Sequence, residues 1–178
     1  MSLQQVILVN ENDEQIGVME KIAAHEKALL HRAFSIFIFN SDGLMLLQKR
    51  AASKYHSPGL WTNACCSHPM PGEATDIAAI RRLYEELGFI TPIKKAFHFT
   101  YQAPFDNGLT EYEFDHVFVG AYDGEVQPDP HEVDTCRYVH PDDIEKEITA
   151  NPASYTPWFL IAFPKLKQWM HQNSYAYA

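Results

Sequence analysis

Residues 67–89 read SHPMPGEATDIAAIRRLYEELGF, a loop with two prolines and a glycine that leads into a helical pattern. In the helical part, apolar residues recur at the spacing of one buried helix face: Ile77, Ile80, Tyr84 and Leu87. Thr75 or Asp76 can cap the start of this helix, and Gly88 suits the position just past its end. The stretch therefore predicts an amphipathic helix that packs its apolar side against a neighbouring layer.

The segments around this helix alternate like strands joined by tight turns. The predicted elements are two short strands in residues 4–21, hairpins over 32–50 and 97–122, and helices over 140–149 and 156–172. Pro164 lies inside the last helix and predicts a kink there.

Strands with interspersed helices, joined mainly by hairpins, predict an α/β (α+β) fold with a mixed sheet sandwiched between helices. A doubly wound nucleotide-binding fold is disfavoured because the sequence has no glycine-rich turn between a strand and a helix. The length of 178 residues fits one domain over residues 1–178.

The composition bears on which partners the protein binds and on the compartment in which we expect it. The net charge of −9 argues against a general nucleic-acid or anionic-membrane surface. No signal-peptide pattern opens the chain, and its apolar runs are too short to span a membrane. Three cysteines give no disulfide framework, so we expect free thiols in a reducing, cytoplasmic compartment.

Residues 61–73 (WTNACCSHPMPGE) place Cys65 and Cys66 side by side near His68. A disulfide, a metal site and a catalytic thiol are the candidate explanations. Neighbouring cysteines rarely bridge because the ring is strained. A nucleophile toward an acyl group would need an activating base and an oxyanion hole, and only His68 supports that role. The loop cysteine is therefore best interpreted as a proton-transfer group.

Carboxylates alternate along EYEFD, so Glu111, Glu113 and Asp115 project from one face of a strand. Such a face is often simply solvated. Three like charges nevertheless repel unless solvent or a cation compensates them. With His25, His31 and His68, the carboxylates of Glu111 and Glu113 offer a ligand set that suits zinc, manganese or iron, although each histidine alone is more often structural.

Residues 67–89 also resemble the Nudix box. Glu73 stands eight residues before Arg81, and RRLYEELGF follows the ending REUxEExGU of that motif, where U is a bulky aliphatic residue. Ser67 replaces the usual first glycine, and Arg82 replaces the glutamate after the arginine. The resemblance implies a Nudix-like sheet between helices, with a weakened magnesium cluster for hydrolysis.

Basic residues gather near these segments: Lys21, Lys49, Arg50, Lys54, Arg81 and Arg82, six of the 14 in the chain. Arginine offers a bidentate fork to phosphate and lysine a point charge. Ordinary surface charge is the alternative. In an acidic protein we interpret the group as a diphosphate clamp.

Five segments occur in order: RAFSIFIF, LLQKRAASK, PGLWTNACCSHP, the altered box and EYEFD. Together they resemble the type I isopentenyl-diphosphate isomerase branch of the Nudix superfamily, and the resemblance runs from about Val6 to Trp158. The resemblance implies interconversion of isopentenyl and dimethylallyl diphosphate, with a small isoprenoid diphosphate as the partner and no nucleic acid or membrane.

The resemblance also implies roles for individual residues. Those implied for catalysis are Cys66, Glu113, a supporting Tyr101, and Trp158 facing the hydrocarbon. The first metal site matches His25, His31, His68, Glu111 and Glu113, which would hold Mn²⁺, Zn²⁺ or Mg²⁺. A Mg²⁺ ion that carries the diphosphate is linked to Glu86. The basic positions associated with diphosphate binding are Lys21, Arg50, Lys54 and Arg82.

Two other functions remain open at this point. A Nudix hydrolase acting on nucleoside diphosphate derivatives is favoured by Glu85 and Glu86 and disfavoured by Arg82. A binding module in which the histidines and carboxylates hold a structural ion is the third. The sequence leaves open the identity of the ion in the histidine site and the oligomeric state.

Overall fold

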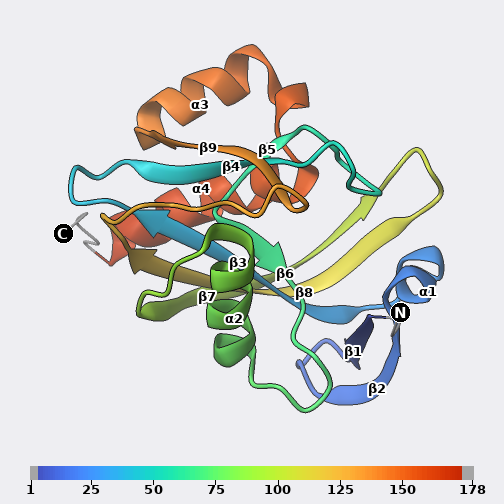
Figure 1. Cartoon of the computed structure of the whole chain (residues 1–178). Helices are drawn as coiled ribbons and strands as arrows, with labels where there is room; N and C mark the ends of the chain where they lie inside the picture. Colours follow the sequence, from blue (N-terminus) through green and yellow to red (C-terminus); the bar gives the residue numbers. More distant parts are fainter. Residues whose placement is uncertain (1–3, 174–178) are drawn as a thin grey trace.

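The computed structural model describes residues 4–173 (Figure 1). Its strands are β1 (Gln5–Val9), β2 (Gln15–Glu20), β3 (His31–Phe39), β4 (Met45–Arg50), β5 (Trp61–Thr62), β6 (Cys65–Ser67), β7 (Ile93–Pro104), β8 (Thr110–Ala121) and β9 (Val133–Val139). Its helices are α1 (Lys21–Glu26), α2 (Thr75–Leu87), α3 (Pro141–Ala150) and α4 (Pro157–Gln172), with a short 3₁₀ turn at Pro152–Ser154.

Strand β3 is the centre of the sheet. It runs parallel to β8 from the pair His31↔Glu113 to the pair Phe39↔Ala121, and β6 lies antiparallel on its other side. The predicted hairpin over residues 32–50 is confirmed at its turn, where β3 and β4 pair antiparallel at Phe39↔Met45, but this is the one pair recorded between the two strands among the described residues. Strand β4 instead pairs along its length with β9, which the sequence analysis missed. The predicted hairpin of β7 and β8 is confirmed.

The mixed sheet lies between helices, as predicted. Phe37 and Phe39 pack in the cluster that includes residues of α4, whereas Ile36 and Ile38 pack in the cluster that includes residues of α2. Successive side chains of a strand point to opposite faces, so β3 contributes to both cores in turn. Figure 1 shows α2 in front of the sheet and α4 behind it.

The buried face of α2 is only partly the predicted one: Leu87 is buried and Ile80 is half-buried, but the other two predicted residues are exposed. Ile77 and Tyr84 are 58% and 57% exposed, and the buried apolar residues are Ala78, Ala79, Leu83 and Leu87. The small alanines let the helix lie close to the sheet, and a pattern based on bulky residues does not detect them. Ala74 precedes the helix without a side-chain cap, whereas Gly88 ends it with φ of 76°, as predicted.

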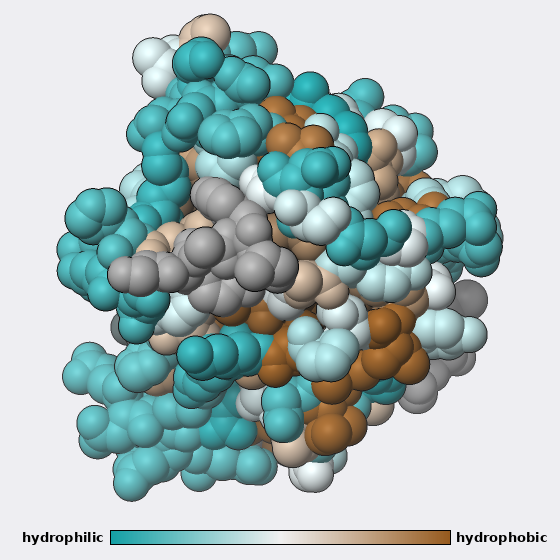
Figure 2. Space-filling model, turned by 90° about the vertical axis from the view of Figure 1, so that its left-hand side faces the viewer, coloured by the Kyte–Doolittle hydropathy of each residue, from teal (hydrophilic) through white to brown (hydrophobic). Residues whose placement is uncertain are grey.

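Figure 2 shows one largely hydrophilic face with a cluster of hydrophobic residues at its lower right. Within residues 4–173, no helix has both the length and the apolar character required to cross a bilayer.

Candidate active site

A cavity of about 310 Å³ holds most of the predicted site residues. Those that line it are Lys21, Arg50, Lys54, Cys66, His68, Arg82, Glu86, Tyr101, Glu111, Glu113 and Trp158. A volume of this size lies at the lower end of the range for small-molecule sites. His25 and His31 do not line the cavity but lie beside His68 and Glu113, as described next.

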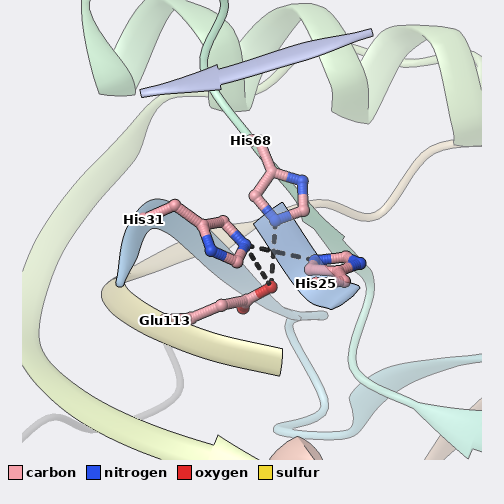
Figure 3. A group of neighbouring side chains, drawn as sticks. All are labelled: His25, His31, His68 and Glu113. Atoms are coloured by element: carbon pink, nitrogen blue, oxygen red, sulfur yellow. Dashed lines mark hydrogen bonds and ion pairs between the residues drawn. The ribbon is translucent and has the colours of Figure 1, made fainter. Parts of the chain in front are cut away.

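Four buried side chains converge at one point: His25, His31, His68 and Glu113 (Figure 3). One potential ligand atom from each lies within 4.8 Å of all the others. They come from α1, the first residue of β3, the residue after β6, and β8. The pairing of His31 with Glu113 across β3 and β8 brings two of them together, which sequence spacing alone could not show.

The hydrogen bonds of this group suit a divalent cation. His31 Nδ1 lies 2.8 Å from the carbonyl oxygen of Leu29, so a proton there leaves the Nε2 lone pair facing the group. His25 Nε2 and His31 Nε2 are only 3.2 Å apart, a contact that needs a proton or a cation to be favourable. Burial lowers the pKa of His25 to about 3 and that of His68 to about 4, so both rings are neutral, the form that binds metals. The residues therefore fit a divalent ion.

Glu113 is held as a carboxylate. His68 Nε2 lies 2.9 Å from its Oε1, and the Tyr101 hydroxyl donates to its Oε2 over 2.7 Å. Burial alone would raise the pKa of Glu113, but the interactions of its carboxylate with His68 and His31 outweigh burial and hold that pKa well below its usual range.

Glu111 lies next to the four-residue group but outside it. Its carboxylate accepts from the Tyr101 hydroxyl over 3.0 Å and lies 3.2 Å from His56 Nε2. Burial and the negative charge of Glu113 raise the pKa of Glu111 well above its usual range. His56, which the sequence analysis did not single out, is therefore a direct neighbour of a predicted metal ligand.

The two adjacent cysteines face opposite sides of the sheet. Residues 65–67 form strand β6 rather than the expected loop, and strand alternation sends Cys65 into the core beneath α2 and Cys66 into the cavity. Both are free thiols. Burial raises the pKa of the Cys66 thiol well above its ordinary value, so the group is neutral at pH 7.

A network that the sequence analysis missed connects Cys66 to Trp158. The Cys66 thiol donates to Asn63 Oδ1 over 3.1 Å, and Thr62 Oγ1 donates to the same atom over 3.0 Å. Thr62 Oγ1 in turn accepts from Trp158 Nε1 over 2.9 Å. Ser35 Oγ lies 3.3 Å from the Cys66 sulfur and donates to the buried Asp115, the third carboxylate of the strand. The thiol and the indole are thus fixed by one set of buried hydrogen bonds.

Several of the basic residues at the cavity are already paired with carboxylates of the protein. Arg82 donates to Glu86 over 2.7 Å and to Glu132 over 3.2 Å, and Lys54 also pairs with Glu132. Glu132, the residue before β9, was not expected near the site from the sequence because it is 50 residues from Arg82. Burial, followed by the charge of Lys54, lowers the pKa of Lys21 to about 8, so Lys21 is still a cation at pH 7.

Two predicted clamp residues have other contacts. Arg81 lines the cavity but binds Glu73 over 2.7 Å, which ties the loop before α2 to the helix. Lys49 is not among the lining residues and lies 3.5 Å from Asp134, because β4 turns it away from the side of Arg50.

The fold has several neighbours among solved structures. A protein from Deinococcus radiodurans superposes with a TM-score of 0.69 at 22% identity, covering 83% of this chain and 90% of that one. The MutT protein from Methanosarcina mazei gives 0.65 at 17% identity, covering 81% and 95%. The NUDIX domain family matches residues 29–159. The chain therefore belongs to the Nudix family.

Sequence relatives narrow this class. The isopentenyl-diphosphate Delta-isomerase of Pectobacterium atrosepticum is 48% identical over 166 residues, which is 93% of each chain. That of Serratia proteamaculans is 50% identical over 88% of each chain, and that of Burkholderia multivorans is 44% identical over 95% of this chain and 99% of its own. Within the Nudix family, the chain belongs to the isopentenyl-diphosphate Delta-isomerases.

Proposed function

We propose that this protein interconverts isopentenyl diphosphate and dimethylallyl diphosphate by adding a proton at one carbon and removing one from another. The observation that carries the proposal is the cavity in which Cys66, Glu113 and Trp158 meet several basic side chains. The isomerases at 44–50% identity over most of the chain support the same activity.

The reaction needs two proton-transfer groups. A proton added at the terminal alkene carbon leaves a tertiary carbocation at C3, and loss of a proton from C2 forms the new double bond. Cys66 is a neutral thiol that can give a proton, and Glu113 is a carboxylate that can take one. In the reverse direction the two groups exchange roles. Tyr101, which donates to Glu113, orients that carboxylate.

The cation must be protected from water. Trp158 is 3% exposed and lines the cavity, so its ring can stabilise the positive charge by cation–π attraction. Its Nε1–H donates to Thr62, which fixes the plane of the ring. Because an alkene is a poor base, this stabilisation is required for protonation to proceed.

The remaining residues hold the diphosphate and the ions. Lys21, Arg50, Lys54 and Arg82 bind the anionic end of the substrate. A divalent ion, Mn²⁺, Zn²⁺ or Mg²⁺, held by His25, His31, His68, Glu113 and the adjacent Glu111 would fix Glu113 and adjust its proton affinity. A Mg²⁺ ion at Glu86 would neutralise the diphosphate. The free cysteines suit a reducing compartment, and we assign the reaction to the cytoplasm.

The two alternative functions are less well supported. In the Nudix box that residues 67–89 resemble, a glutamate stands at the position of Arg82, so this chain lacks one carboxylate of the set that a hydrolase uses; Arg82 instead donates to Glu85 and Glu86. A purely structural ion would not account for a buried thiol and an indole in the same cavity. The identified relatives favour the isomerase as well.

The test is turnover of isopentenyl diphosphate with magnesium in deuterated water. We expect deuterium in the recovered dimethylallyl diphosphate, and its absence contradicts the proposal. Cys66→Ala should lower kcat by a factor of about 10²–10⁴, the usual contribution of an acid–base group. Cys65→Ala is the matched control and should keep most activity, because that side chain packs beneath α2. Equal losses would show that Cys66 has no special role.

A further inference from the structure

A second cavity, of about 600 Å³, lies against the active-site cavity. Tyr55 and His56 line both cavities, so these two residues separate them. The outer cavity is formed by the segment after Lys54, the turn between β7 and β8, and the start of α4. Its lining is largely apolar and includes Pro58, Leu60, Phe105, Pro157 and Leu160.

The ring of His56 is fixed on several sides. It stacks on Phe105 with centroids 4.7 Å apart and an interplanar angle of 16°. It meets the ring of Trp158 edge-on at 5.6 Å and that of Tyr55 edge-on at 4.4 Å. Its Nε2 lies 3.2 Å from Glu111. His56 is 7% exposed and stands between the two cavities, packed on both sides by these contacts.

We propose that His56, supported by Phe105, is the wall that ends the hydrocarbon part of the active site and limits the substrate to a five-carbon chain. This inference rests on the proposed function. Lys54 and Arg82 hold the anionic end of the ligand, and Trp158 faces the hydrocarbon, so a longer chain extends from Trp158 toward the ring that packs edge-on against it. The apolar cavity behind His56 would accept the extra carbons once the wall is removed.

The test is direct calorimetric binding of two saturated, unreactive ligands to the full chain with magnesium present. The ligands are 3-methylbutyl diphosphate and its ten-carbon homologue 3,7-dimethyloctyl diphosphate. The native protein should bind the shorter ligand more tightly. In His56→Ala the ratio of the two dissociation constants should shift toward the longer ligand by about tenfold or more, because further methylene groups become buried.

Two variants separate the wall from the hydrogen bond to Glu111. His56→Phe keeps a ring but removes the hydrogen bond, and it should preserve the native ratio. Phe105→Ala removes the stacking partner and should shift the ratio in the same direction as His56→Ala. Leu160→Ala is the matched control, because Leu160 lines only the outer cavity and should leave the discrimination against the longer ligand in place.

An unchanged ratio in both His56→Ala and Phe105→Ala, with normal binding of the shorter ligand, overturns the inference. A shift in His56→Phe equal to that in His56→Ala also overturns it, because the hydrogen bond would then be responsible. These outcomes are independent of turnover. A negative result in the isomerase assay in deuterated water is therefore distinguishable from a negative result for the proposed role of His56.

Discussion

The substitution Thr62→Val tests whether the hydroxyl group of Thr62 orients both the Trp158 indole and the Cys66 thiol in the cavity. Thr62 is 1% exposed. Its hydroxyl accepts from Trp158 Nε1 over 2.9 Å and from Thr156 Oγ1 over 3.0 Å, and it donates to Asn63 Oδ1 over 3.0 Å. Valine has nearly the same shape, so the change removes the hydrogen bonds with little change in packing volume.

The expected loss in the free energy of unfolding follows from the buried donors that lose their hydrogen-bond acceptor. Asn63 Oδ1 still accepts from the Cys66 thiol, so two buried donors, on Trp158 and Thr156, become unsatisfied. Each unsatisfied buried group costs about 1–3 kcal/mol, which gives a loss of about 3 kcal/mol in the free energy of unfolding. For a domain of this size that corresponds to a fall in Tm of about 6–12 °C.

The assay is urea unfolding at pH 7, together with kcat and KM for isopentenyl diphosphate. We expect kcat to fall by about tenfold with a smaller change in KM, because the indole and the thiol lose their fixed orientation while the diphosphate contacts remain. Thr149→Val is the control. Thr149 is exposed and donates only to a carbonyl of its own helix, so its loss should stay within about 0.5 kcal/mol.

A loss below about 1 kcal/mol in Thr62→Val would refute the reasoning, since two buried donors cannot lose their partners at so little cost. An unchanged kcat in a destabilised variant would show that Thr62 supports the fold but does not orient the reacting groups.

Three further predictions concern charge. In the metal-free folded protein, the pKa values of His25 and His68 are about 3 and about 4, below the ordinary value of 6.5. The unfolded chain therefore binds more protons than the folded chain, and the free energy of unfolding should fall as the pH falls from about 6.5 toward 4. Urea titrations at pH 7 and pH 5 will measure this change. Tyr101→Phe should lower kcat by about tenfold or more with little change in KM, because Glu113 loses a 2.7 Å donor; a matching rise in KM would contradict this. Arg82→Glu should raise KM by about tenfold or more, because a diphosphate contact becomes a repulsion. Release of inorganic phosphate in place of isomerisation would instead support the hydrolase.

Local periodicity predicted those parts of the site that lie on single strands. The alternation of Glu111, Glu113 and Asp115 on one face is present in the structure, and all three are buried. The same rule explains why adjacent cysteines have different surroundings, although no local pattern predicts that residues 65–67 form a strand. A period of two residues is set by the backbone itself, so it does not depend on the rest of the fold.

Contacts between distant segments could not be predicted in this way. His56 is brought to the cavity by the loop after β4 and Glu132 by the turn before β9, and neither belongs to a local pattern. Strand β3 pairs with β8 along its whole length but with β4 only at Phe39↔Met45, and no local pattern in the sequence indicates how far each pairing extends. The prediction of the buried face of α2 missed Ala78 and Ala79 for a related reason. These two small residues are buried only because the sheet lies close to them.

Counting charges along the sequence also overestimated the positive potential of the site. Six of the 14 basic residues were assigned to a diphosphate clamp, yet the structure pairs Lys49, Lys54, Arg81 and Arg82 with carboxylates. A diphosphate must therefore compete with Glu132 for Lys54 and with Glu86 for Arg82. A cation that neutralises Glu86 would release Arg82 for the phosphate oxygens and add positive charge at the same place. This electrostatic balance supports the proposed magnesium ion at Glu86, which the family resemblance implies, and it depends on pairings that only the folded chain reveals.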